Sequence, residues 1–172
     1  PVGSGAFGNE FGATNKVGAP MLVGAAIARA VGADIAMHGA LSDAALPAGP
    51  LTRSHLWRII PFENTIVLAS VTADDVRLIR KDIAKFAGSR QQRWFFGLRS
   101  PIQSKDALFI GDGRKFAPNE RMLLAVNSFD AASAGGRLPA LRAVLEKPES
   151  RAVWTGINTR QALEDYIRAN TS

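Results

Sequence analysis

The stretch from Gly32 to Val71, GADIAMHGALSDAALPAGPLTRSHLWRIIPFENTIVLASV, decides the fold of this chain. Short apolar runs alternate in it with turn-forming residues. Residues 33–37 predict a buried strand, because the run between its glycine breakers is too short for a helix. Residues 54–60 predict a short helix. Residues 65–71 are β-branched and mostly apolar, which is typical of a strand covered on both faces.

Helix signals flank this stretch on both sides. Pro20 at a first helical position and Gly32 as a stop predict a helix over residues 20–31. Thr72 with Asp75 three residues later resembles a capping box, and it predicts a helix from there to about residue 87, before Gly88. Further patterns predict strands at 93–98, 107–110 and 122–126, a helix at 138–145, and a last helix capped by Asn158 and Gln161.

This order of elements resembles the C-terminal domain of the 5'-nucleotidase family. There a strand and a Gly-rich turn precede an L-P-A-G-P-[IL]-T segment, a short helix and a P-F-x-N turn into a second strand. Here the last part reads Leu46–Thr52, the short helix, and PFEN at 61–64. The resemblance extends from about Pro20 to Pro139. It implies an α+β fold, a mixed sheet of about four to six strands with helices packed on it, mainly on one side.

Length and composition are those of one domain. The chain has 172 residues, 47% of them hydrophobic, and no cysteine. We expect residues 1–19 to be a linker or irregular entry segment, and residues 20–172 to form the domain. GSGAFG at 3–8 matches a dinucleotide-binding pattern but lacks the strand that must precede it. Because the chain begins at Pro1 and not at Met, we expect it to be a piece of a longer polypeptide.

The chain carries a formal charge of +6, with an isoelectric point near 10.3. Such a charge favours an anionic partner. The basic residues are scattered among acids, however, and the helical group at 77–85 is typical of a solvated face. We therefore expect no nucleic-acid partner. We expect no membrane partner either, since no apolar run approaches the roughly 18 residues of a spanning helix.

Catalytic residues are not assigned in this chain. A two-metal phosphoesterase needs converging His, Asp and Asn ligands. This chain has only two histidines, His38 and His55. A Ser-His-Asp site from His38, Ser42 and Asp43 is disfavoured, because three residues of one turn seldom converge and no G-x-S-x-G elbow exists. The resemblance implies divalent metals in a separate, upstream metallophosphoesterase domain. We expect no metal or cofactor here, and no activity for this chain alone.

The resemblance implies substrate contacts at the PFEN turn. The family's matching Phe stacks on the nucleobase, a role it implies for Phe62; such stacking is worth roughly 1 to 3 kcal/mol per base. Without the resemblance, a core Phe would be favoured. Asn64 matches a position close to the base, where an amide can pair with ring edges. Alternatively, Asn64 caps the turn.

Two motifs depart from the family pattern. The family turn N-G-G-x-I-R reads HGALSD, which places His38 at the Asn, Gly39 at the first Gly and Asp43 at the Arg that pairs with the anionic part of the substrate. The family loop G-G-D-G-[YF] reads GGRLP, with Arg137 at the acid and Pro139 at the second aromatic. A carboxylate at position 43 would repel an anionic substrate, because like charges repel strongly in a partly desolvated pocket. Since both motifs reverse the charge of the family residue, we hypothesise that Asp43 and Arg137 face each other as an exchanged ion pair.

The function that follows is substrate binding within a periplasmic or secreted 5'-nucleotidase-like metallophosphoesterase. Its partners would be a nucleotide or related small phosphate ester and the upstream domain. The alternative is a non-catalytic ligand-binding or interaction module that retains the fold. The sequence leaves open the substrate, the metal, the oligomeric state and the orientation of the two domains.

Overall fold

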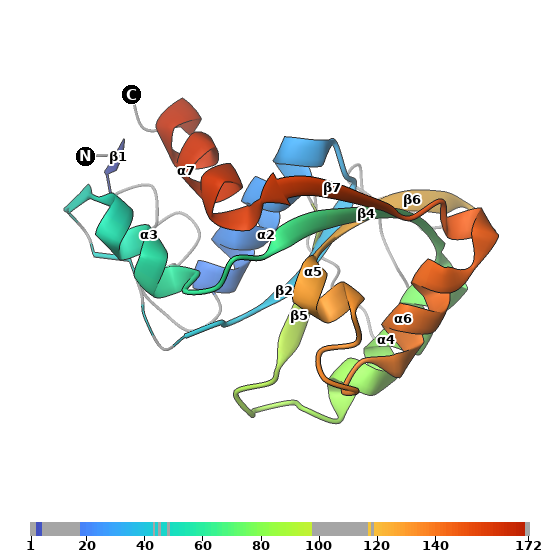
Figure 1. The fold of residues 1–172 in the computed structure, drawn as a ribbon. Coiled ribbons are helices and arrows are strands. Elements are labelled where there is room, and N and C mark those ends of the chain that lie inside the picture. The colour runs from blue at the N-terminus through green and yellow to red at the C-terminus, as the bar shows by residue number, and fades with distance from the viewer. Residues whose placement is uncertain are drawn as a thin grey trace.

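The computed structural model describes residues 3–4, 18–42, 44, 46–47, 49–97, 117 and 119–170 (Figure 1). The expected strand at 107–110 lies outside these residues. The elements are β1 Gly3–Ser4, α2 Gly18–Val31, β2 Ile35–Gly39, β3 Pro50–Leu51, α3 Arg53–Ile59, β4 Thr65–Thr72, α4 Ala73–Ala84, β5 Arg93–Gly97, β6 Arg121–Asn127, α5 Ser128–Ala131, α6 Pro139–Glu146, the 3-10 turn η1 Pro148–Ser150, β7 Val153–Asn158 and α7 Thr159–Asn170.

A five-stranded mixed sheet organises the described chain, in the order β5-β2-β6-β4-β7. Strands β2 and β6 run parallel, and the other neighbours are antiparallel. A separate two-stranded ribbon pairs β1 with β3. The α+β class and the mixed sheet predicted from the sequence are confirmed. The proposed boundary after residue 19 stays a prediction.

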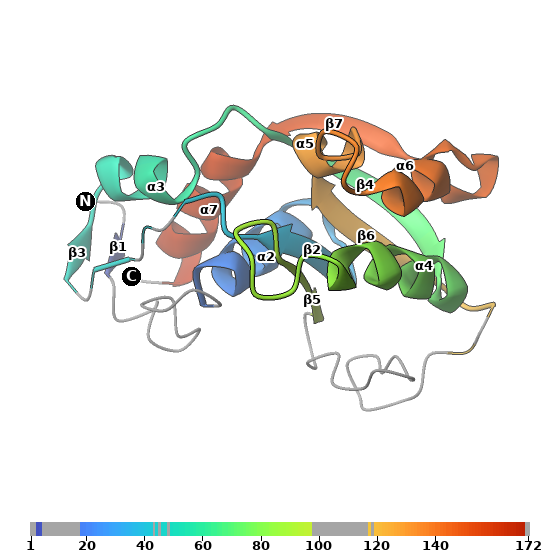
Figure 2. The same cartoon turned by 90° about the horizontal axis from the view of Figure 1, so that it is seen from below.

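Two apolar cores pack against opposite faces of the sheet. Neighbouring residues of one strand point to opposite sides, and Ile66 belongs to the core formed with α2, α3 and α7, whereas Val67 belongs to the core formed with α4 and α6. Figures 1 and 2 show α4 and α6 together, apart from α2 and α7. The expectation of helices mainly on one side was wrong, because the strands are apolar on both faces and both must be covered.

Local signals for helix ends hold in the structure. The Thr72 Oγ1 accepts a hydrogen bond from the Asp75 amide at 3.2 Å, and the Asp75 carboxylate accepts one from the Thr72 amide at 3.0 Å. Helix α4 ends at Ala84, three residues before the predicted end, and turns lead to Gly88 with φ +76°. Asn158 Oδ1 accepts from the amides of Arg160 and Gln161, so it caps α7 as predicted. The Gln161 amide group, in contrast, donates to acidic side chains within α7.

Strand β7 was not predicted. Most of its residues are exposed and none is buried, because it lies at the edge of the sheet. Gly156 interrupts it with φ +73°, near a register shift in its pairing with β4. The sequence of this segment shows neither alternation of apolar and polar residues nor a continuous apolar run, so no pattern predicted a strand there. No helix in the part of the chain that the structure describes is long and apolar enough to span a membrane.

Candidate functional site

One edge of the sheet collects most of the residues singled out in the sequence. Strands β2 and β6 run parallel, with Ala36 opposite Ala125, so both end at this edge. Strand β4 begins there, with Ile66 opposite Asn127. The Thr65 amide donates to Ser128 Oγ at 3.0 Å, which ties the start of β4 to the start of α5. The turn before β4, the end of β2 and the loop after β6 therefore meet at one place.

Phe62 lies on the exposed turn between α3 and β4. The residue is 55% exposed, so the alternative of a core Phe is excluded. Burying a Phe side chain contributes roughly 1.5 to 3 kcal/mol, and this ring forgoes most of that gain. Its position allows contact with a ligand, and its role as a stacking residue stays a prediction.

Arg160, at the start of α7, binds this turn mainly through the main-chain carbonyl groups of the turn. Its Nε donates to the Ile60 carbonyl at 2.9 Å, and its Nη2 donates to the Phe62 carbonyl at 3.2 Å. Its Nη1 pairs with Glu63 Oε1 at 2.9 Å, and this hydrogen bond lowers the pKa of Glu63. The guanidinium carbon lies 3.3 Å from the centroid of the Trp57 ring. One side chain thus fixes both ends of the turn.

Asn64 is 9% exposed, which places most of it inside the turn. Its carbonyl accepts a hydrogen bond from the Thr159 amide at 2.9 Å and one from Thr159 Oγ1 at 3.3 Å. These bonds join the turn to α7. They show a structural role for the main chain of Asn64, and contact of its amide with a base stays a prediction.

His38 and Gly39 belong to strand β2 and not to the following turn, where the sequence reading placed them. His38 is 1% exposed; its Nδ1 donates to the Gly39 carbonyl at 2.6 Å, and its Nε2 is buried without a hydrogen-bond partner. Burial lowers the pKa of His38, although the nearby Asp130 charge opposes this shift. At position 39, a Cβ would lie 2.5 Å from the Gln92 carbonyl oxygen, so only glycine lets β2 and β5 approach this closely.

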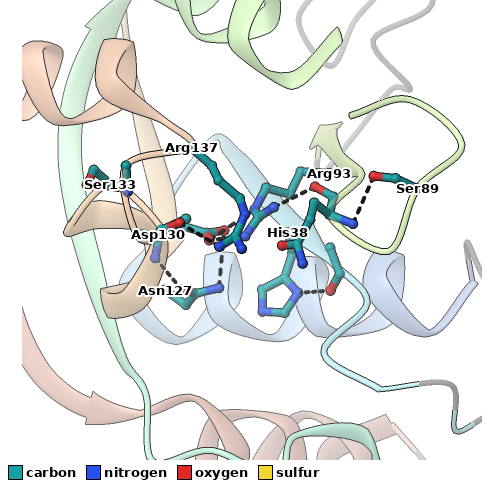
Figure 3. Close-up of polar contacts among 11 residues, drawn as sticks. His38, Ser89, Arg93, Asn127, Asp130, Ser133 and Arg137 are labelled. Atoms are coloured by element: carbon teal, nitrogen blue, oxygen red, sulfur yellow. Dashed lines mark hydrogen bonds and ion pairs between the residues drawn. The ribbon is translucent and has the colours of Figure 1, made fainter. Parts of the chain in front are cut away.

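Sequence reasoning missed a buried polar cluster beside His38, which we define as Arg93, Asn127 and Asp130 (Figure 3). Arg93 Nη2 pairs with Asp130 Oδ1 at 2.8 Å, and Arg93 Nε donates to the same oxygen at 3.0 Å. Asn127 Oδ1 accepts from the Asp130 amide at 2.8 Å. The order Asn-x-x-Asp is a helix N-terminal signal that could have revealed Asn127 and Asp130. Arg93 carries no such signal.

The loop after α5 has unusual main-chain geometry. Ser133, Ala134, Gly135 and Gly136 all have positive φ, from +51° to +89°. For the two residues that are not glycine, this conformation costs of order 1 to 3 kcal/mol each, and such strain clusters at ligand-binding sites. Arg137 Nη1 donates to the Ala134 carbonyl at 3.0 Å, which helps to hold the loop.

The hypothesis of an exchanged ion pair remains untested. Asp43 lies outside the described residues, so its pairing with Arg137 stays a prediction. Pro139 is the first residue of α6 and offers no aromatic ring. A second exposed aromatic at this edge is Phe129 of α5, which is 46% exposed; the sequence reading did not single it out.

The described residues contain no group of three or more His, Asp or Glu side chains that could hold a metal ion. The polar cluster offers one carboxylate, and that carboxylate is paired with Arg93. The edge of the sheet thus carries two exposed aromatic residues, Phe62 and Phe129, together with a buried, charge-paired polar cluster.

Comparison with known families identifies this arrangement. The model of the 5'-nucleotidase C-terminal domain matches residues 8–143, which is most of the chain. The chain belongs to this family, as its resemblance predicted. No curated protein sequence matches it.

Solved structures share the fold. NAD nucleotidase from Haemophilus influenzae superposes with a TM-score of 0.70 at 11% identity, over 94% of this chain and 31% of that one. A 5'-nucleotidase precursor from Thermus thermophilus has a TM-score of 0.70 at 20% identity, over 88% of this chain and 32% of that one. The sulfate thiohydrolase SoxB from the same organism has a TM-score of 0.57 at 20% identity, over 88% and 29%. The chain thus spans about a third of the length of these structures.

Proposed function

We propose that this chain is the substrate-binding domain of a 5'-nucleotidase-like metallophosphoesterase. The full-length protein would hydrolyse a nucleotide or a related small phosphate ester. The observation that carries the proposal is the exposure of the Phe62 side chain. In the family, the matching Phe of this turn stacks on the base. The three bonds from Arg160 to this turn, which we call the Arg160 clamp, support the proposal. A stacking ring binds best when its main chain is already held in place.

Hydrolysis would be performed by an upstream domain that holds divalent metal ions. Such ions polarise a phosphoryl oxygen and activate water. This chain would bind the base and orient the ester toward them. By analogy with its relatives, we place the full-length protein in the periplasm or outside the cell. Fractionation of cells that express the full-length protein would test this location.

Titration with adenosine, AMP and a UDP-sugar tests the binding role. We expect saturable binding of at least one of them, weakened about fivefold to hundredfold by Phe62→Ala, since stacking is worth roughly 1 to 3 kcal/mol per base. Trp154→Ala is the matched control, because Trp154 is equally exposed, at 56%, but lies on β7. Binding that survives Phe62→Ala unchanged would contradict the assignment.

The chain alone should not hydrolyse AMP or a generic phosphate ester when divalent metal is added. Phosphate release at an enzyme-like rate from the purified 172-residue chain would show the proposal to be wrong. Heat-denatured protein serves as the control for contaminating metal catalysis.

The second candidate is a binding or interaction module that no longer recognises nucleotides. Two observations favour it: the charges of Arg93 and Asp130 neutralise each other, and Asp43 stands where the family has an Arg. Neither feature attracts a phosphate. Absence of binding with all three ligands would select this second function.

A further inference from the structure

A cavity of about 460 Å³ lies between α3 and the start of α7, and Figure 1 shows these two helices side by side. Its volume falls in the range of about 300 to 1,000 Å³ that is usual for small-molecule sites. Neither Phe62 nor the polar cluster lines it. Glu63 of the Phe62 turn belongs to its wall, so the cavity adjoins the sheet edge. Because the Phe62 ring and the polar cluster do not line it, an inference from it goes beyond the function proposed above.

Charges in the cavity wall cancel. Arg53 Nε pairs with Glu164 Oε1 at 2.6 Å, and Arg160 Nη1 pairs with Glu63 Oε1 at 2.9 Å. All four residues line the cavity. A phosphate would meet two carboxylates, and a cation would meet two guanidinium groups. Because opposite charges are balanced in this way, an uncharged ligand loses the least electrostatic free energy on entry.

Two of these charged side chains are themselves buried. The side chain of Glu164 is 7% exposed and that of Arg160 is 10% exposed. Each is held by several hydrogen bonds: Glu164 accepts from Arg53 and Gln161, and Arg160 donates to two main-chain carbonyls. Their positions are thus fixed before any ligand arrives, which lowers the entropic cost of binding.

The wall combines many polar side chains with apolar surface that includes one aromatic ring. Six of the eight lining side chains are polar or charged, and the apolar ones are Leu56 and Trp57. Trp57 is 51% exposed, and the guanidinium of Arg160 lies against its ring. The side chains of Asn158 and Gln161 add amide groups, each of which can both donate and accept.

This composition distinguishes between flat bases and sugars. A nucleobase carries polar atoms only at its rim, and its two faces are flat and apolar. A sugar has hydroxyl groups around its whole circumference and a face of C–H groups, whose partial positive charge suits the negative face of an aromatic ring. We infer that the cavity between α3 and α7 binds a neutral sugar or a similar polyol, with Trp57 against its C–H face and the paired charges and amides bonded to its hydroxyls.

Saturation-transfer NMR on the whole chain tests this with glucose, galactose and mannose, and with glucosamine and glucose 6-phosphate as charged counterparts. We expect saturable binding of at least one neutral sugar, and weaker binding of its charged counterparts. Trp57→Ala should raise the Kd about twofold to tenfold, and Trp57→Phe should restore part of the loss. Gln161→Ala, at an exposed position of the wall, is a second variant that should also raise the Kd, since it removes an amide that can bond to a hydroxyl group.

Two controls separate this proposal from the nucleotide-binding role. Trp154→Ala and Phe62→Ala should leave sugar binding unchanged, whereas Phe62→Ala alone should weaken nucleotide binding. Failure of all three neutral sugars to bind would overturn the inference, as would wild-type affinity in both Trp57→Ala and Gln161→Ala. Tighter binding of glucose 6-phosphate than of glucose would overturn the preference for an uncharged ligand.

Discussion

At the residue scale, the contrast between Phe62 and His38 shows how burial separates roles. Phe62 is an apolar ring left in water, and His38 is a polar ring taken out of it. Each arrangement costs folding free energy. The exposed ring is available to a ligand, whereas the buried imidazole, hydrogen-bonded to Gly39, supports the edge of the sheet from within.

Phe62→Ala should leave stability almost unchanged. Because more than half of the residue is already exposed, we expect a change in the free energy of unfolding within about 0.5 kcal/mol, measured by urea denaturation. Removal of a buried Phe costs roughly 3 to 5 kcal/mol. A loss of that size would show that Phe62 supports the core, and any loss of binding could then not be assigned to stacking.

His38 should make stability depend on pH below its ordinary pKa. Burial holds the folded pKa of His38 below its ordinary value of 6.5, so the unfolded chain binds the proton first as pH falls. The contribution is fully present above about pH 6.5 and is lost as pH falls toward the folded pKa. Urea denaturation from about pH 7.5 to about pH 5 should show a smaller pH effect in His38→Gln than in the wild type. Parallel curves for the two proteins would contradict the buried, neutral imidazole.

At the element scale, α7 does more than cover one face of the sheet. Its first residues bond to the turn before β4 through Thr159 and Arg160, and its Leu163 and Ile167 enter the core with α2. The position of the Phe62 turn is therefore set by a helix about a hundred residues away in the sequence.

Arg160→Ala should loosen this turn. It leaves the carbonyls of Ile60 and Phe62 without their donor, and we expect a loss of about 2 to 4 kcal/mol in the free energy of unfolding. Arg142→Ala is the control, since Arg142 pairs with Glu146 on the surface and should cost about 0.5 kcal/mol or less. Equal effects of the two substitutions in chemical denaturation would argue against the clamp. Arg160→Lys keeps the charge but cannot reproduce the three directed bonds. We therefore expect it to recover little of the stability that Arg160→Ala loses.

At the scale of the whole molecule, two apolar cores pack on opposite faces of one sheet, and we expect the shared sheet to make them unfold together. Leu163 is fully buried on the α2 face and Leu141 on the α4 face. Replacement of either residue by Ala should lower the free energy of unfolding by about 2 to 5 kcal/mol, measured by chemical denaturation.

Leu78→Ala is the control for these two variants, since Leu78 is an exposed residue of α4 and should change stability by less than about 1 kcal/mol. A mild effect at Leu141 together with a large one at Leu163 would mean that the α4 face contributes little to folding. A single unfolding transition in both variants is expected if the sheet couples the two cores.

Particular residues explain which parts of this fold were predictable. Thr72 and Asp75 satisfy each other's main-chain groups within one turn, and Asn158 caps α7 through two neighbouring amides. Such bonds depend on sequence neighbours alone, so the pattern reveals them. Strand β7 depends on pairing with β4, which is distant in sequence, and its exposed residues carry no period.

The candidate site divides in the same way. Contiguous motifs singled out Phe62, Asn64, His38, Gly39 and Arg137, and their roles in binding stay predictions. Arg93 and Asp130 lie 37 residues apart and meet only when β5 and α5 are both in place. The cavity of Arg53, Trp57, Arg160 and Glu164 likewise forms only when α7 packs on α3, and no motif spans that separation.

The sequence by itself determined the family, the mixed α+β class and the turn that exposes Phe62, because each rests on local hydrogen bonding or on a contiguous motif. The tertiary structure alone decided that helices cover both faces, that His38 is buried beside a paired Arg and Asp, and that Arg160 clamps the Phe62 turn. Those features arise from contacts between segments distant along the chain. Their free energy comes from burial and charge pairing, which arise only when the sheet brings the segments together.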